Sequence, residues 1–418
     1  MPDYQAPKGM RDVLAPESGR WATVVATFAE HARRAGFGLA LTPLIEHLEV
    51  FERVGDSTDI VRKEMYDFTD KGGRRVAVRP EITAGLMRAF AEHRPPTPWK
   101  AWSVGPNFRY EQPQSGRYRQ HHQLDAEIVG TADPDADVEL IALLDGFHVA
   151  LGLRQRTLKL NTLGDLAERP AYLEALRGHF AAHATELSEQ SRQTLALNPL
   201  RVFDSKRPED APVIETAPPV VDYLSDAAAS HFDRVRAGLD ALGIAYVLDP
   251  RLVRGLDYYT RTTFEFAATA SDSAQNAIGG GGRYVGLVEQ LGGPAGTPGV
   301  GFGAGIERIL LACDAEAVSP AEAASVDAFV VDTAGGMDAL LLTAALRDAG
   351  VAADRAYDGR SMKAQMKAAD RSGAALALII GADEAEAGEV TVRSLRGERA
   401  EQMRVPRDKV VDYVKEHR

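Results

Sequence analysis

The segment NFRYEQPQSGRYRQHHQLDAEIVG spans residues 107–130 and has the pattern of a β-hairpin. Polar and apolar residues alternate toward both ends, as in half-buried antiparallel strands, and Pro113 and Gly116 between them favour a turn. The segments RRVAVRP (74–80) and WKAWSVG (99–105) alternate similarly, without a regular exchange of strands and helices. The sequence therefore predicts an α+β fold built on an antiparallel sheet with helices against it.

The hairpin also predicts a polar surface. Because side chains alternate between the faces of a strand, Arg109 and Glu111 share one face, and Gln123, Asp125 and Glu127 share a face of the returning strand. Arginine suits phosphate oxygens, and carboxylates suit an ammonium or another N–H donor. For this segment alone, a solvated face with cross-strand ion pairs is the simpler interpretation.

The N-terminal part predicts a helix and an edge strand. Apolar residues recur at helical spacing over residues 17–35 and stop at Gly36, a natural helix terminator. The strand pattern FGLALTPLIE (37–46) contains Pro43. Because proline cannot donate a ladder hydrogen bond, this strand is predicted at a sheet edge or an interface.

The remaining patterns predict an interrupted core and a separate C-terminal domain. Residues 1–165 and 231–318 supply the two parts of the core, and residues 166–230, rich in Ala, Leu and Glu, predict a helical insertion. The small, polar segment 313–325 is the best domain boundary. Strand and helix patterns alternate beyond it, which predicts a small α/β domain over residues 326–418.

Composition limits the class of protein. The chain has 418 residues, 45% of them hydrophobic, and a formal net charge of -12, so it lacks a general basic footprint for nucleic acid. Its single cysteine, Cys313, cannot form an internal disulfide. The N-terminal segment has no apolar signal region and no apolar run approaches the length of a membrane span. We therefore expect a cytoplasmic protein.

Two further segments carry candidate site residues. RPEITAG (79–85) places Glu81 and Thr83 where a strand gives way to a helix, although a glutamate in the first helical turn also serves simply to cap the helix. RGLDYYTRTTFEF (254–266) combines a cation, a carboxylate and two tyrosines with a strand pattern. Tyrosines at a strand edge are often packing residues, so this segment is either a polar strand edge or one wall of a site.

The segment GVGFGAGIERILLA (299–312) has glycine at alternate positions before a helix. This spacing does not match the dinucleotide fingerprint. Alternate glycines leave one face of a strand bare, so that a planar ligand or another backbone can approach, and Arg308 projects from the first helical turn. Close helix packing is the alternative explanation.

Other chemistries lack support. His179 and His183 are the only histidines at helical i, i+4 spacing, and HFAAH lacks the glutamate of the metalloprotease helix. The sequence contains no nucleophile elbow and no phosphate-loop lysine, which argues against a kinase.

Five segments, in order along the chain, resemble histidyl-tRNA synthetases, which are class II aminoacyl-tRNA synthetases. The segments are the Pro43 strand with its preceding helix (motif one), FRYEQPQSGRYRQHHQ (motif two), LVRGLDYYTRTTFEF and GGGRYVGL (the two histidine peptides), and GVGFGAGIERILLA (motif three). PKGMRDVLAPES also looks like the N-terminal segment of this family. The resemblance covers nearly the whole chain and implies a class II sheet, a helical insertion and a C-terminal anticodon-binding domain. It also implies a homodimer.

The resemblance assigns roles to individual residues. It implies that Glu81, Thr83 and Gln123 hold the histidine α-ammonium, that Glu127 and Tyr259 face the imidazole, and that Tyr258 and Tyr284 enclose it. It implies an ATP site from Arg109, Glu111, Arg117 and Arg308, with Mg²⁺ on the phosphates and no protein metal site, and a catalytic Arg254 at the α-phosphate. Arg360, Lys363 and Lys367, on a predicted basic helix, are the implied tRNA contacts.

The implied activity is ligation of L-histidine to its tRNA through an ATP-derived adenylate. The alternative is a regulatory paralogue, like the synthetase-like subunit that controls ATP phosphoribosyltransferase, but such subunits lack the anticodon domain and usually degrade the histidine peptide. A different class II synthetase is disfavoured by the paired tyrosines and Glu127. The chain departs from the family pattern at Val285, where we expect aspartate, and at His121, where a bulky apolar residue is more usual.

Replacing Arg254 by alanine or histidine is expected to abolish most adenylation without unfolding the protein, because a permanently charged guanidinium stabilises the charge that develops at the α-phosphate. ATP–pyrophosphate exchange measures this step. Normal exchange by a folded variant would remove Arg254 from the mechanism.

Overall fold

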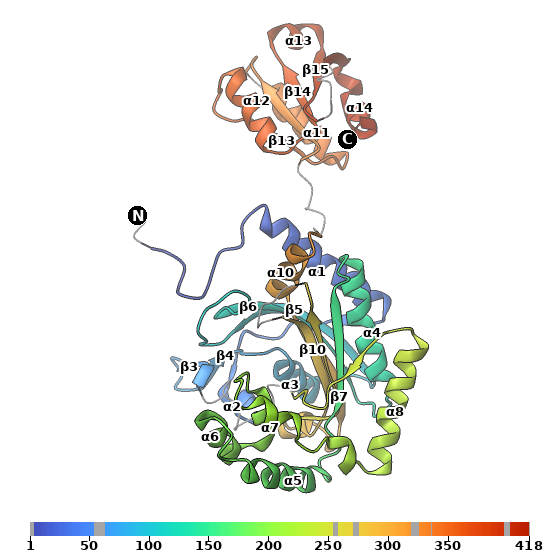
Figure 1. The fold of residues 1–418 in the computed structure, drawn as a ribbon. Helices are drawn as coiled ribbons and strands as arrows, with labels where there is room; N and C mark the ends of the chain where they lie inside the picture. Colours follow the sequence, from blue (N-terminus) through green and yellow to red (C-terminus); the bar gives the residue numbers. More distant parts are fainter. Residues whose placement is uncertain are drawn as a thin grey trace. The chain divides into compact units, whose positions relative to one another are not determined.

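The computed structural model describes residues 4–53, 63–253, 258–270, 276–318, 326–335, 337–396 and 402–417. The chain divides into two compact units, Met1–Pro320 and Ala321–Arg418. The first unit contains an eight-stranded and a three-stranded sheet, and the second a five-stranded sheet (Figure 1). Each unit has its own hydrophobic core.

An eight-stranded sheet forms the centre of the first unit. Its strands, in spatial order, are β1 (Gly38–Leu39), β5 (Trp99–Phe108), β6 (Gln120–Val129), β11 (Pro298–Gly305), β10 (Ala277–Val285), β9 (Tyr259–Ala268), β7 (Arg156–Thr162) and β8 (Val247–Leu248). The six inner strands pair antiparallel, and only the edge strands β1 and β8 pair parallel. The predicted antiparallel α+β architecture is confirmed.

Helices α1 (Glu17–Arg34), α4 (Asp135–Ala150), α8 (Asp226–Ala241) and α10 (Ile306–Ala315) cover one face of this sheet. Their apolar side chains form the main core with alternate residues of the strands. Phe28 of α1, for example, makes edge-to-face ring contacts with Phe147 of α4 and Phe302 of β11, at centroid distances of 5.1 and 6.0 Å. Since alternate strand residues point away from this core, the opposite face is left for α3 (Thr83–His93), α9 (Leu287–Gln290) and the polar site.

Pro43 divides the predicted strand 37–46 in two. β1 lies at the edge of the large sheet, as expected for a strand next to proline. β2 (Ile45–His47) belongs instead to a three-stranded sheet with β4 (Arg75–Val78) and β3 (Tyr66–Thr69), next to α2 (Leu48–Glu52).

Residues 166–230, the predicted insertion, contain α5 (Arg169–Ala182), α6 (Glu189–Leu197), α7 (Ala211–Glu215) and the 3₁₀ turns η2 (Pro199–Asp204) and η3 (Val220–Tyr223). These elements share a small core of their own, which includes Leu176, Phe180 and Val202. Helix α8 begins at Asp226 and packs against α4 of the main core.

The expectation that Arg109 and Glu111 lie on a strand was wrong. β5 ends at Phe108, and both residues belong to the loop that joins it to β6. The backbone N–H of Glu111 donates to the carbonyl of Arg109 at 2.8 Å, so the chain turns back on itself instead of continuing the ladder. The N-terminal arm supports this loop, because Arg119 N–H donates to Gly9 O at 2.8 Å.

The second unit is a five-stranded sheet with helices. The strand order is β13 (Ala353–Arg355), β12 (Ala328–Asp332), β14 (Leu376–Ile380), β15 (Glu389–Ser394) and β16 (Gln402–Pro406), and β12 pairs parallel with both of its neighbours. Its helices are α11 (Met337–Asp348), α12 (Met362–Arg371), α13 (Ala382–Ala387) and α14 (Val410–His417), the last preceded by the 3₁₀ turn η4 (Arg407–Lys409).

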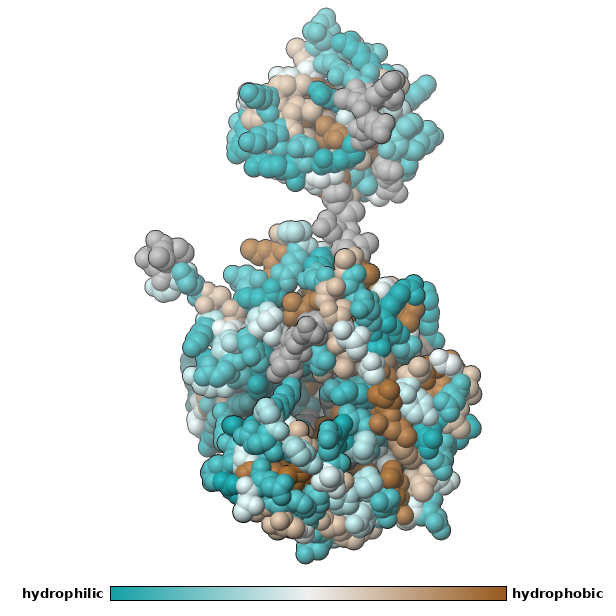
Figure 2. All heavy atoms as spheres, viewed as in Figure 1, coloured by the Kyte–Doolittle hydropathy of each residue, from teal (hydrophilic) through white to brown (hydrophobic). Residues whose placement is uncertain are grey.

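The visible surface of both units is largely hydrophilic, with apolar side chains in separate small groups (Figure 2). None of the helices in the described ranges is long and apolar enough to cross a lipid bilayer.

Two aspartates of α4 pair with arginines in opposite environments. Asp137 and Arg283 are fully buried, with Arg283 Nε 3.0 Å from Asp137 Oδ2 and side-chain exposures of 0% and 1%. Asp135 pairs with Arg234 at 2.8 Å on the surface, where the side chains are 53% and 57% exposed. Removing one partner of a buried pair leaves a desolvated charge, whereas an exposed pair contributes little.

Asp137→Ala is therefore expected to lower the free energy of unfolding by about 3–5 kcal/mol, and the control Asp135→Ala by at most about 1 kcal/mol. Urea unfolding followed by tryptophan fluorescence measures both, because all three tryptophans of the chain, Trp21, Trp99 and Trp102, lie in the first unit. Equal effects of the two variants would contradict the difference in burial.

Candidate functional site

A cavity of about 190 Å³ lies where β6, β10 and β11 meet the start of α10. Arg109, Arg117 and Arg308 line it together with Glu111 and Glu307. The backbones of Gly279, Gly280, Gly303 and Gly305 also line it. The cavity is thus rich in guanidinium groups and partly bounded by bare main chain.

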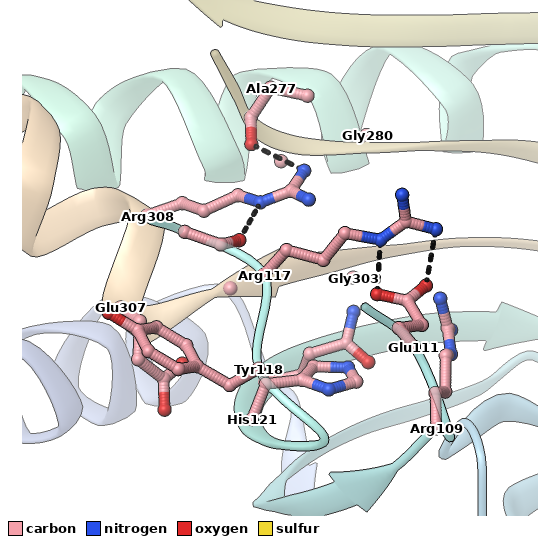
Figure 3. A pocket seen from close by; sticks show the side chains of 14 residues that line it. Arg109, Glu111, Arg117, Tyr118, His121, Ala277, Gly280, Gly303, Glu307 and Arg308 are labelled. Atoms are coloured by element: carbon pink, nitrogen blue, oxygen red, sulfur yellow. Dashed lines mark hydrogen bonds and ion pairs between the residues drawn. The ribbon is translucent and has the colours of Figure 1, made fainter. Parts of the chain in front are cut away.

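Main-chain carbonyls orient two of these arginines. Arg109 Nε donates to Pro80 O at 2.9 Å, and Arg308 Nε donates to Gly116 O at 2.8 Å. Arg117 forms two hydrogen bonds with Glu111, one of them from Nη2 to Oε1 at 3.0 Å, and this contact raises the pKa of Arg117 (Figure 3). Although burial lowers the pKa of Arg308, an arginine keeps its charge in a protein. The cavity therefore suits a ligand with several phosphate groups.

His121 stands beside these arginines as a neutral ring. Burial lowers its pKa to about 3, and the charges of Arg109 and Arg308 act in the same direction. A neutral, planar ring at this position replaces the apolar residue that the family pattern predicts without adding charge to the cavity.

A second, acidic region adjoins the cavity. Glu127 of β6 is 1% exposed and accepts hydrogen bonds from Thr83 Oγ1 at 2.6 Å and from the Tyr284 hydroxyl at 2.8 Å. Burial raises the pKa of Glu127 to about 8, despite these two hydrogen bonds. Glu127 is thus held in one orientation and offers a buried acceptor to a ligand N–H.

Tyrosine rings enclose this acidic region. The ring of Tyr258 lies 4.6 Å from that of Tyr259 and 5.5 Å from that of Tyr284, measured between centroids. All three side chains are buried, and burial raises the pKa of Tyr258 and Tyr284 well above the usual range. Tyr258 and Tyr284 therefore stay neutral. Tyr258 and Tyr259 are buried, so they form a wall of the region rather than a solvated strand edge.

Glu81 contacts the start of α3 and also lies near Glu127. Its Oε1 accepts from Ala84 N–H at 2.7 Å, as a residue that caps the start of α3 does. It is also buried close to Glu127, and burial raises its pKa. Glu81 and Thr83 thus lie at the edge of the acidic region.

The alternate glycines of β11 make room for these side chains. A Cβ atom on Gly301 would overlap the Glu127 carboxylate, and one on Gly299 would overlap the Tyr284 ring. The bare face predicted for this strand is therefore filled by side chains of the neighbouring strands β6 and β10 as well as by open cavity.

Gln123 connects the two regions. It lines the arginine cavity and shares a strand face with Glu127. Asn107 Nδ2 donates to Gln123 Oε1 and orients the amide.

The sequence patterns assign no role to Asn107 or to Glu307. The Glu307 carboxylate accepts from His122 Nδ1 at 2.8 Å. Strand alternation could have found Asn107, because it pairs with His121 across the hairpin and so faces the site.

Arg254 is outside the described residues. Arg360, Lys363 and Lys367 are exposed at and along α12 of the second unit. In the part of the chain that the structure describes, no three His, Cys, Asp or Glu side chains are grouped as metal ligands.

Comparisons with known proteins identify the family to which the chain belongs. A model described as histidyl-tRNA synthetase matches residues 9–309, and a model described as anticodon binding domain matches residues 330–417. The chain belongs to the histidyl-tRNA synthetase family. This confirms the resemblance inferred from the five segments.

Full-length relatives agree with this assignment. A histidine-tRNA ligase of Rhodococcus erythropolis is 48% identical over 415 residues, which are 98% of this chain and 97% of the relative. One from Geobacillus kaustophilus is 44% identical over 421 residues, or 99% and 98% of the two chains. The apo crystal structure of S. aureus histidyl-tRNA synthetase superposes with a TM-score of 0.81 at 34% identity, covering 99% of this chain and 100% of that chain.

Gly301→Ala is expected to lower the free energy of unfolding by about 1–3 kcal/mol, because the new methyl group must displace the buried Glu127 carboxylate. The control Gly178→Ala, inside α5 with open space around it, should be neutral or stabilising by up to about 1 kcal/mol. Urea unfolding compares them. A neutral Gly301→Ala would show that Glu127 is not confined against β11.

Proposed function

We propose that the protein ligates L-histidine to its cognate tRNA in two steps, through a histidyl-adenylate. The observation that carries this proposal is that β6 supports both regions: Gln123 lines the arginine cavity, and the buried acceptor Glu127 lies on the same face of the strand. A small amino acid bound at one end would thus present its carboxylate to a triphosphate bound at the other. Membership of the histidyl-tRNA synthetase family over the whole chain supports the same activity.

Histidine recognition is assigned to the acidic region. Glu127 and Tyr259 would satisfy the two imidazole nitrogens, and Tyr258 and Tyr284 would enclose the ring. Glu81, Thr83 and Gln123 would hold the α-ammonium. An amino acid without the imidazole N–H groups would leave buried polar atoms unpaired, and a site of that kind rejects the wrong side chain strongly.

ATP binding is assigned to the cavity of Arg109, Glu111, Arg117 and Arg308. The Arg117–Glu111 contact would have to loosen or reorient for the Arg117 guanidinium to reach a β- or γ-phosphate. The neutral His121 ring and the bare backbone of Gly279 and Gly280 leave space for a flat base.

Activation needs no protein nucleophile. The histidine carboxylate attacks the α-phosphorus, an O–P bond forms, and the bond to pyrophosphate breaks. A tRNA hydroxyl then attacks the acyl carbon and AMP leaves. Because two anions are brought together, positioning and fixed positive charge supply the acceleration, and Arg254 completes this charge in the proposal.

Magnesium would accompany the β- and γ-phosphates, where it neutralises charge on the leaving group. Mg²⁺ takes oxygen ligands, usually one or two carboxylates plus phosphates and waters. The Glu111 and Glu307 carboxylates in the lining of the cavity fit that donor set.

Contacts with tRNA are assigned to both units. Arg360, Lys363 and Lys367 give α12 an exposed basic face, although the chain as a whole is acidic. Contacts to the RNA backbone are largely electrostatic, so such a local face is what an anticodon stem requires.

We also propose a cytoplasmic homodimer. Leu39, Leu41, Leu44 and Ile45 around Pro43 have exposed side chains, and such a concentration of apolar groups is typical of a protein interface.

Amino-acid-dependent ATP–pyrophosphate exchange, without tRNA, tests the first step. Exchange is expected with histidine and not with the other amino acids. Folded protein that binds histidine but exchanges nothing would contradict the proposal and favour a regulatory histidine sensor instead.

A further inference from the structure

Asp125 lies on β6, between two residues that the proposed function assigns to histidine, and has no role in the reaction described above. Because side chains two residues apart on a strand share a face, β6 places it between Gln123 and Glu127. Asp125 pairs with Gly303 of β11, where a Cβ atom would lie 3.0 Å from Asp125 Oδ1 and 2.8 Å from Gln123 Nε2. The Asp125 carboxylate is therefore next to the Gln123 amide, where the two regions meet.

The Asp125 carboxylate is buried and incompletely satisfied. Its residue is 3% exposed, and its Oδ2 accepts no hydrogen bond from any residue that the structure describes. Ser103, its partner on β5, has a buried hydroxyl that is also without a hydrogen bond there. A buried carboxylate without donors is costly, so this position favours a donor that comes from a bound molecule.

The neighbouring arginines do not donate a hydrogen bond to Asp125 Oδ2. Burial and the charges of Glu127 and Glu81 raise the pKa of Asp125, whereas the charges of Arg79 and Arg109 lower it. Arg79 Nε donates to Pro106 O at 3.0 Å, and Arg109 Nε donates to Pro80 O at 2.9 Å. Both guanidinium groups are thus oriented by main-chain carbonyls. No ion pair within 4.0 Å joins either of them to Asp125 in the described ranges of the chain.

The other acceptors at this place are already partly used. An ammonium group has three N–H donors. Glu81 Oε1 accepts from Ala84 N–H, Gln123 Oε1 accepts from Asn107, and Thr83 Oγ1 donates to Glu127. Because these three acceptors are already engaged in other hydrogen bonds, the unused Asp125 Oδ2 can take an N–H that they satisfy only in part.

We propose that Asp125 binds the α-ammonium of the amino acid substrate, together with Glu81, Thr83 and Gln123. The proposal rests on the proposed function. A carboxylate is the strongest neutralising partner for an ammonium, and the contact fixes the end of the substrate whose carboxylate must face the α-phosphate.

The electrostatics of the free protein are consistent with this role. Burial, followed by the nearby Glu127 and Glu81, raises the pKa of Asp125 well above its usual range. An arriving ammonium favours the charged carboxylate, so binding would replace a proton by the substrate cation.

Asp125→Asn, which keeps the size of the side chain and removes its charge, tests the assignment. Binding of L-histidine and of imidazolepropionate, which lacks the ammonium, is measured by titration calorimetry without ATP. Histidine affinity is expected to fall about ten- to a hundredfold, as for loss of a hydrogen bond to a charged group, with imidazolepropionate affinity unchanged. The control Asp135→Asn removes an equal charge at the surface and should change neither.

Unchanged histidine affinity in Asp125→Asn would overturn the inference. So would an equal loss for both ligands, which would mean that Asp125 acts on the imidazole or on the shape of the site. If Asp125→Asn does not fold, the affinities for histidine and imidazolepropionate are compared in Asp125→Ala instead. These outcomes are separate from the proposed function, which fails only if the unmodified protein shows no histidine-dependent exchange.

Discussion

The close approach of Glu127 to the backbone of β11 is the constraint on which the site depends. A side chain at Gly301 would occupy the volume of the Glu127 carboxylate, and one at Gly299 would occupy that of the Tyr284 ring. With those positions bare, Glu127 lies flat against the sheet and accepts from Thr83 and Tyr284. The glycines therefore act through the space that they leave for neighbouring side chains.

The antiparallel sheet turns this local feature into a two-sided architecture. Alternate residues of β6 and β11 point to opposite faces, so Phe302 enters the helical core and the glycines on either side of it face the site. The same alternation gives β10 the buried Arg283 on one face and Tyr284 on the other. The same strands thus carry the helical core on one face and the polar site on the other.

The carboxyl groups and the arginines of the site lie in separate regions and differ in how burial affects their charge. Burial raises the pKa of Glu127, Glu81 and Asp125, so the acidic region carries less negative charge than its composition suggests. The arginines stay charged even where burial lowers the pKa of Arg308, because a guanidinium gives up its proton only at very high pH. A neutralised acceptor region beside a permanently cationic cavity suits a zwitterion on one side and a polyphosphate on the other.

The sequence by itself determined the fold class, the family and the site residues to propose, because hairpin alternation and ordered short motifs are local patterns. Local patterns were less informative about loops. Arg109 and Glu111 continue a strand-like alternation, yet a turn at Glu111 removes them from the ladder. Only the tertiary structure decided that the glycine face is filled by Glu127 and Tyr284, and that Asp125 is buried with an unused oxygen. The physical reason is that burial and close packing depend on strands that are distant in sequence, whereas alternation depends only on neighbours along the chain.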